Sequence, residues 1–226
     1  MQPETLILED RLTRLTLAPM IGASIVNWSV IASGQPLLRP SADTALNSGL
    51  PGRLACYPLV PWSNRIGGGG FDGPQHWFAL QPNSRTEALP IHGSGWQQPW
   101  RVIEHTAQHA CLQLESTVPF AYRAQLHYRL SEGQLRIELS VTHQDERAAW
   151  HGHGLISQPD LGYELECRAT GAPYCLVYCP EAEDFFCFEP VSHPVNAHHL
   201  PGRPGLKLLH RGQSAELALS MSYRPL

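Results

Sequence analysis

The 226-residue sequence is poor in charge and has no long helical pattern. Only 16% of its residues are charged, below the roughly 25% of ordinary soluble proteins. No segment keeps a 3.6-residue apolar period over three turns. Glycine and proline are instead frequent, with 19 and 20 residues. This composition favours many strands and turns over long helices.

The chain also lacks the features that attract nucleic acids or insert into membranes. Its formal net charge is −4, which gives no electrostatic reason to expect a polyanionic partner. The N-terminal sequence MQPETLILED has no basic region followed by an apolar stretch, as a signal peptide would. No apolar run approaches the roughly 20 residues that span a bilayer. We therefore expect a cytoplasmic protein without nucleic-acid or membrane partners.

The six cysteines do not form a recognisable disulfide or zinc pattern. A domain of this size does not need disulfides for stability. Cys175 and Cys179 have a C-x3-C spacing, but no second half of a zinc motif accompanies it. We therefore expect reduced cysteines in the core, at positions Cys56, Cys111, Cys167, Cys175, Cys179 and Cys187.

Alternating apolar residues predict strands over most of the chain. The stretches YRAQLHYRL (122–130) and QLRIELSV (134–141) alternate strictly, and the short SEG between them suits a hairpin turn. AELALSMSY (215–223) repeats the pattern, and further candidates cover 11–18, 23–31, 100–106 and 110–116. No linker or internal repeat divides the sequence. We therefore predict one all-β domain over residues 1–226.

The first polar stretch is YPLVPWSNRIGGGGFDG (57–73), where Asn64 and Arg65 precede four glycines. No Lys-Ser/Thr pair follows the glycines, so the stretch is not a phosphate-binding P-loop. Amide and guanidinium groups bind vicinal hydroxyls, while Trp62 and Phe71 offer aromatic faces for sugar C–H groups. The alternative is an arginine that only ties down the loop.

Two further stretches combine a candidate acid or base with aromatic neighbours. In LPIHGSGWQQPW (89–100), His92 precedes Gly93, which allows close approach of a ligand, and Trp96 follows. In DFFCFEP (184–190), Glu189 stands among aromatic residues, whose low polarity would raise its pKa toward the range of a general base. The alternatives are a structural histidine and a glutamate that points outward from an edge strand.

Besides these three stretches, the histidine pair in AWHGHG (149–154) is a candidate site. Its spacing suits a metal site, a catalytic pair or a plain loop. A cupin-type metal site needs a glutamate a few residues beyond H-x-H. The next glutamate after His153 is Glu164. We therefore expect no metal and no cofactor.

In this order, the motifs PLVPWSNRIGGGGF, IHGSGWQQPW and FFCFEPVSHPVNAHH resemble the aldose 1-epimerase (galactose mutarotase) family. The resemblance extends from about residue 6 to the C-terminus. It implies a large antiparallel β-sandwich of the galactose mutarotase type. It also implies an isomerase that interconverts the α and β anomers of a hexose by cofactor-free ring opening.

The resemblance assigns roles to particular residues. Glu189 would be the general base, and His92 would bind the reacting end of the sugar and assist protonation of its ring oxygen. Asn64 and Arg65 would bind sugar hydroxyls. Chemistry of this kind requires acid and base pKa values near neutrality.

The sequence departs from the family pattern in its middle. The family usually carries a second histidine, the principal acid, in a segment like HPYF, and a later acidic residue that binds hydroxyls. This chain passes from VTHQDERA directly to AWHGHGLI, so the sandwich is shortened by roughly 50 to 60 residues relative to family length. Either the segment before Trp150 is deleted, which we favour, or His151 is the remnant of the second histidine.

The shortened sequence leaves two functions open. The first is a mutarotase-like enzyme of reduced activity, with Glu189, His92 and His151 as catalytic residues. The second is a catalytically inactive carbohydrate-binding protein, because the deletion harms catalysis more than binding. A sandwich that has lost strands also exposes an edge, which favours a homodimer.

Overall fold

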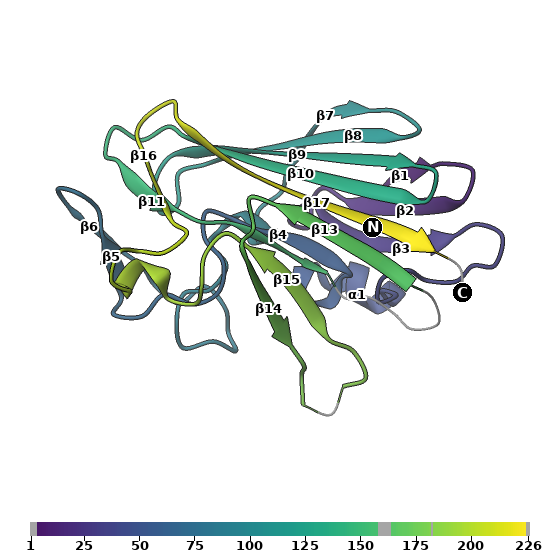
Figure 1. Ribbon diagram of the computed structural model, residues 1–226, viewed down its shortest axis with the longest axis horizontal. Helices are drawn as coiled ribbons and strands as arrows, with labels where there is room; N and C mark the ends of the chain where they lie inside the picture. The colour runs from purple at the N-terminus through teal and green to yellow at the C-terminus, as the bar shows by residue number, and fades with distance from the viewer. Residues whose placement is uncertain (1–3, 158–163, 182, 225–226) are drawn as a thin grey trace.

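The computed structural model describes residues 4–157, 164–181 and 183–224, and two antiparallel β-sheets packed face to face dominate it (Figure 1). This arrangement confirms the predicted all-β, antiparallel sandwich. Helices are short. The α-helix α1 has six residues (Asp43–Ser48), and three 3₁₀ turns are η1 (Pro51–Arg53), η2 (Gly95–Gln97) and η3 (Ala197–His199). Among the described residues, no helix is long and apolar enough to cross a membrane.

The first sheet has seven strands and carries most of the polar motifs. In spatial order its strands are β1 (Leu6–Glu9), β2 (Thr13–Ala18), β3 (Ser24–Val30), β4 (Cys56–Leu59), β12 (Gly154–Ser157), β15 (Cys187–Val191) and β14 (Tyr174–Tyr178). The glutamate strand β15 therefore lies inside the sheet, and β14 is the edge. The alternative of Glu189 on an edge strand is wrong.

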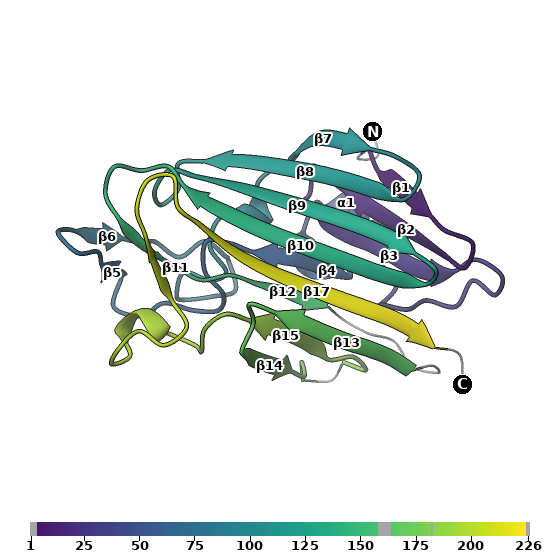
Figure 2. The same ribbon diagram turned by 45° about the horizontal axis from the view of Figure 1, so that its top comes forward.

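The second sheet has six strands and forms the opposite layer (Figure 2). In spatial order its strands are β13 (Glu164–Thr170), β17 (Ser214–Arg224), β10 (Gln134–His143), β9 (Tyr122–Ser131), β8 (His109–Ser116) and β7 (Arg101–His105). The predicted hairpin is present, because Ser131 pairs with Gln134 across Glu132 and Gly133. Both turn residues have positive φ, as a two-residue hairpin turn requires.

Two small ribbons extend one end of the sandwich (Figure 1). One pairs β5 (Gly70–Asp72) with β6 (Trp77–Ala79), directly after the four glycines. The other pairs β11 (Ala149–His151) with β16 (Lys207–Leu209). The histidine pair of AWHGHG therefore lies where β11 ends and β12 begins.

The main core fills the space between the two sheets because each strand turns its alternate apolar residues inward. Leu126 and Leu139 from one sheet and Ile25 and Trp28 from the other are fully buried there. The cysteine prediction holds only in part. All six cysteines are free, as expected, but Cys167 is half-buried and Cys175 is exposed, because their strands β13 and β14 are sheet edges, and Cys179 is exposed in the connection that follows β14.

A hydrogen bond between the two layers is expected to contribute measurably to stability. The buried hydroxyl of Tyr128 on β9 donates to the carbonyl oxygen of Ala23 at 2.6 Å. Removing the hydroxyl leaves that carbonyl unsatisfied in the core, so Tyr128→Phe should lower the free energy of unfolding by about 1–3 kcal/mol. Urea denaturation measures the change. The control is Tyr178→Phe on β14, where the tyrosine is 58% exposed, and equal losses in both variants would contradict the prediction.

Candidate functional site

The candidate site lies on the face of the seven-stranded sheet that points away from the main core. A separate apolar cluster covers this face, formed by Tyr57 and Leu59 of β4, Cys187 of β15, and the neighbouring Trp96 and Phe185. Residues two apart on a strand share a face. Glu189 therefore emerges beside this cluster, on the same side of β15 as Cys187.

Glu189 is a buried carboxylate without full hydrogen bonding. Only 5% of the residue is exposed, and Oε2 has no hydrogen-bond partner within the described structure. Burial raises the pKa of Glu189 from 4.5 to about 7, and the positive charge of Arg65 offsets part of the rise. The expected rise in pKa is therefore present, although its cause is general burial beside Tyr57 and Cys187. The carboxylate changes its protonation state near neutral pH, as a general base requires.

His92 is held as a neutral hydrogen-bond donor. Its Nδ1 accepts a hydrogen bond from the backbone N–H of Asn64 at 3.0 Å, which leaves the ring proton on Nε2. Burial, reinforced by the charge of Arg65, lowers the pKa of His92 to about 3. At neutral pH the imidazole therefore offers an N–H but carries no charge. It can stabilise a developing negative oxygen, and it is not an imidazolium acid.

Glu189 and His92 share neighbours. The ring of Tyr57 lies 6.4 Å from that of His92, edge to face, and Glu189 is close enough for its charge to raise the pKa of Tyr57. The Arg65 charge acts on both His92 and Glu189. Trp96 stacks on Tyr57 at 5.7 Å and meets the edge of His92 at 6.3 Å. The sheet therefore brings together Glu189, His92, Arg65 and Trp96 from three of the sequence motifs.

Arg65 is only partly free to bind a ligand. Its Nε and Nη2 donate to the carboxylate of Glu87 at 2.8 and 2.6 Å, and its Nη1 donates to Oδ1 of Asn64 at 3.3 Å. A bidentate pair of this kind fixes the guanidinium plane. Glu87 therefore orients Arg65, and no sequence motif marks Glu87, because its loop has no recognisable pattern.

The loop that carries His92 is built on close backbone packing. Asn83 donates to the carbonyls of Ile91 and Gly93 at 2.8 and 2.7 Å, and its Oδ1 accepts from the Ile91 N–H at 2.8 Å. Gly93 has a φ of 66°, and a Cβ there would stand 2.0 Å from the Val60 carbonyl oxygen. Only glycine therefore fits behind the histidine. Asn83 is a second residue that the motifs did not reveal.

Two predicted sugar-contacting residues are packed inside the protein. Trp62 is 4% exposed and Phe71 is fully buried, both in the main core. Phe71 packs on Phe78 at 5.2 Å and on His198 at 4.3 Å. Because protein atoms cover their rings, this burial argues against a contact between either residue and a sugar.

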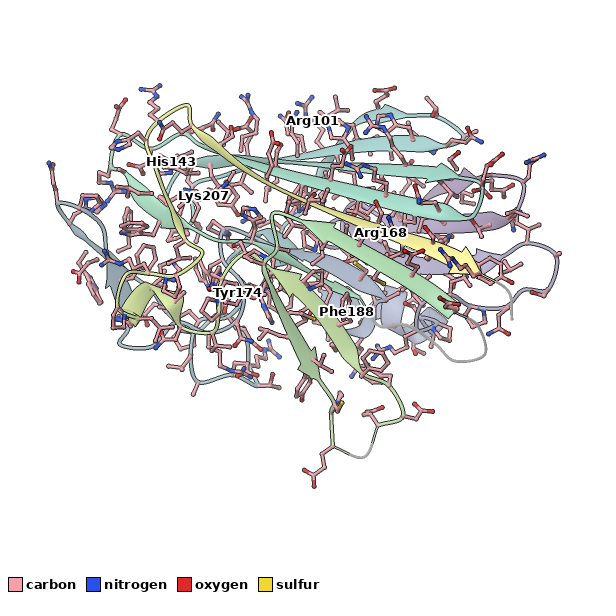
Figure 3. The ribbon with its side chains drawn as sticks, in the orientation of Figure 1. Arg101, His143, Arg168, Tyr174, Phe188 and Lys207 are labelled. Atoms are coloured by element: carbon pink, nitrogen blue, oxygen red, sulfur yellow. The ribbon has the colours of Figure 1, made fainter. Side chains whose placement is uncertain are left out.

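His151 lies in a group of buried histidines at the end of the sandwich. Its Nε2 is 2.9 Å from Nδ1 of His143, and its ring packs against Phe120 at 4.8 Å. Burial and the neighbouring histidines lower its pKa well below the usual value. Figure 3 shows His143 at the end near β11 and β16, apart from Phe188 on β15. His151 is therefore a neighbour of His143, whereas the neighbours that Glu189 and His92 have in common are Tyr57 and Arg65.

The buried histidines do not form a metal centre in the described residues, where no group of three or more His, Cys, Asp or Glu side chains is arranged to hold an ion. His193 Nε2 accepts the backbone N–H of Ser63 at 3.1 Å, and His198 Nε2 lies 3.3 Å from the carbonyl of Trp150. These contacts join the loops after β4, β11 and β15, so they are structural.

Comparisons with known proteins point to one family. Residues 8–155 match the family model described as aldose 1-epimerase. The uncharacterized protein YphB of Escherichia coli K12 is 27% identical over 259 aligned residues, covering 82% of this chain and 88% of that protein. A crystal structure from E. coli K12 superposes with a TM-score of 0.83 at 23% identity, covering 99% of both chains. The GalM/aldose epimerase homologue from C. elegans gives 0.77 at 12% identity, again covering 99% of both chains.

The raised pKa of Glu189 predicts an unusual pH dependence of stability. Below pH 4.5 the carboxyl is protonated in the folded and unfolded states, and ionisation costs nothing. As the pH rises from 4.5 to about 7, only the unfolded chain ionises freely, so folding loses stability. Glu189→Gln removes this cost and should raise the free energy of unfolding by up to about 3 kcal/mol at pH 8, with little change near pH 4.

Chemical denaturation at both pH values measures this difference. The control is Glu181→Gln, an exposed glutamate in the connection before β15, which should change stability by less than about 0.5 kcal/mol at either pH. A gain for Glu189→Gln that is the same at pH 4 and pH 8 would contradict the account.

Proposed function

Because the chain belongs to the aldose 1-epimerase family, we propose that it interconverts the α and β anomers of a hexose, with Glu189 as the base. One observation carries the proposal. The family's C-terminal E-P motif carries a desolvated carboxylate whose pKa lies at about 7, and this carboxylate shares the neighbours Tyr57 and Arg65 with the neutral His92. A carboxylate exposed to water would be too weak a base for this reaction at neutral pH.

The proposed reaction begins when ionised Glu189 accepts the proton of the C1 hydroxyl. As the C1–O1 bond becomes a carbonyl, the C1–O5 bond breaks and its electron pair moves to the ring oxygen. The Nε2–H of His92 donates a hydrogen bond to that oxygen and stabilises its developing charge. The ring oxygen takes its proton from water. After rotation about C1–C2, the hydroxyl at C5 returns its proton to the hydroxide left by that water and attacks the other face of the aldehyde, and Glu189 returns the first proton to O1.

Solvent replaces the protonated side chain in this scheme because the chain lacks the family's second-histidine segment. The alignment with YphB supports a deletion, since it extends over 259 residues whereas this chain has 226. A positioned acid contributes about 10²- to 10⁴-fold to such a reaction. We therefore propose an enzyme of reduced activity that requires no cofactor.

His151 is the alternative source of the missing proton, and two observations oppose it. Its Nε2 is occupied by His143, and its lowered pKa keeps the ring neutral at physiological pH. A neutral imidazole that is already hydrogen-bonded inside the protein has no proton ready for a sugar. The proposal therefore assigns His151 a packing role.

The base assignment predicts the activity of a single variant. Polarimetry of freshly dissolved α-glucose and α-galactose, with and without protein, gives the catalysed rate. Glu189→Gln should lower kcat/KM by about 10²- to 10⁴-fold, because the amide cannot accept the proton. The wild-type kcat/KM should rise with pH through about 7 as Glu189 ionises. Equal rates with and without wild-type protein would instead support the catalytically inactive carbohydrate-binding protein.

A pair of histidine variants tests the proton source. His92→Phe should lower kcat/KM by at least about tenfold, because it removes the donor to the ring oxygen. His151→Gln should change it by less than about twofold once folding is confirmed by circular dichroism, because a hydrogen-bonding side chain remains beside His143. A loss for His151→Gln as large as that for His92→Phe would assign the acid to His151.

A further inference from the structure

A large cavity adjoins the candidate site but contributes nothing to the chemistry proposed for it. Its volume is about 790 Å³, the largest of the four cavities described. It lies between the segment around α1 and the connection from β14 to β15. Its walls include two cations (Arg39 and Arg53), two carboxylates (Glu183 and Asp184) and two aromatic rings (Phe185 and Phe186).

The cavity and the Glu189 site are parts of one surface. Phe185 lines the cavity and also packs on the apolar cluster of Tyr57 and Cys187. Cys187 stands two residues before Glu189 on the same face of β15, about 7 Å away along the strand. Arg39, which also lines the cavity, is close enough for Tyr57 and Cys187 to influence its pKa. A ligand that begins at Glu189 therefore reaches the cavity by extending along β15 toward its N-terminus.

The walls of the cavity suit a neutral, hydroxyl-rich group. The guanidinium of Arg39 lies 4.2 Å above the ring of Phe185 and donates through Nη2 to the carbonyl oxygen of Arg53 at 2.9 Å. This fixes the plane of Arg39, and no further hydrogen bond from its guanidinium is found among the described residues. Two guanidinium donors and two carboxylate acceptors can bind hydroxyls in both directions, and a second ring, Phe186, is available for sugar C–H groups.

The charges on the cavity walls favour a neutral ligand over an anionic one. A phosphate or carboxylate group would meet the charges of Glu183 and Asp184 together with those of the two arginines. The two carboxylates would repel a negatively charged group in the cavity and so oppose its binding. An uncharged sugar unit meets no such repulsion.

We propose that this cavity is a subsite for a second sugar unit, so that the substrate is the reducing end of a neutral oligosaccharide and not a free hexose. The inference rests on the proposed function, because Glu189 must hold the anomeric carbon for the next unit to reach the cavity. In a pyranose, O4 lies across the ring from C1. A unit linked through O4 therefore extends away from Glu189, toward Phe185 and Arg39.

The test compares sugars that share one reducing end. Glucose, maltose and lactose all present a glucose anomeric carbon, and the two disaccharides carry a second unit on O4. The wild-type kcat/KM for mutarotation should be roughly tenfold higher for at least one disaccharide than for glucose, as one aromatic contact and one hydrogen bond would provide. Phe185→Ala should reduce this ratio to near one, and because the ratio is taken within each variant, a change in the glucose rate itself does not enter the comparison.

Two further variants distinguish loss of the subsite from loss of the fold. Arg53→Gln alters only an exposed side chain and should also lower the disaccharide-to-glucose ratio, whereas Val102→Ala on the far sheet edge should leave it unchanged. A wild-type ratio near one, or a ratio that survives in both Phe185→Ala and Arg53→Gln, overturns the subsite. A rate gain for glucose 6-phosphate larger than for either disaccharide overturns its assignment to a neutral unit.

Binding separates failure of the subsite from failure of the proposed function. Methyl β-lactoside, methyl β-maltoside and methyl β-glucoside cannot mutarotate, and calorimetry measures their affinities without any reaction. Roughly tenfold tighter binding of one disaccharide glycoside than of the glucoside, lost in Phe185→Ala, supports the subsite even if no sugar is epimerised. Equal affinities, or no binding of any of the three, overturn it even if the mutarotase reaction is present.

Discussion

The chemistry proposed for this protein depends on the removal of one carboxylate from water. Glu189 is placed on an internal strand, beside Tyr57 and Cys187, with one oxygen that has no hydrogen-bond partner in the described part of the chain. That position costs folding free energy above neutral pH, because a buried charge loses its hydration. The same desolvation raises the pKa of Glu189 to about 7, which is the range that the proposed general base needs. Stability and catalytic competence are therefore opposed at this residue.

The rest of the site is rigid backbone arranged around that carboxylate. Asn83 and the glycine at position 93 fix the His92 loop against β4, and the Asn64 N–H sets the tautomer of His92. Glu87 fixes the plane of Arg65. The proposed base and the proposed hydrogen-bond donor are therefore both positioned by the seven-stranded sheet and its loops.

The sequence was sufficient to predict the strands, the hairpin and the family, because alternation and turn residues are local signals. Its ordered motifs also marked Glu189, His92, Arg65 and Trp96 as candidates, and the fold brings these four residues into one neighbourhood. Trp62 and Phe71 could not be judged from the sequence, since an aromatic residue in a motif packs inward or outward with equal ease. Tertiary contacts alone define Asn83, Glu87 and the pairing of His151 with His143. The burial of Cys175 on edge strand β14 was misjudged because sheet order is not a local property.

The most direct measurement is a ¹³C NMR titration of the glutamate side-chain carboxyls, with the Glu189 signal identified by its absence in Glu189→Gln. The account predicts a midpoint near pH 7 for this signal, because burial disfavours the charged form. A midpoint near 4.5, as for a carboxylate in water, would show that Glu189 is solvated. It would contradict the central claim that desolvation makes this residue a base.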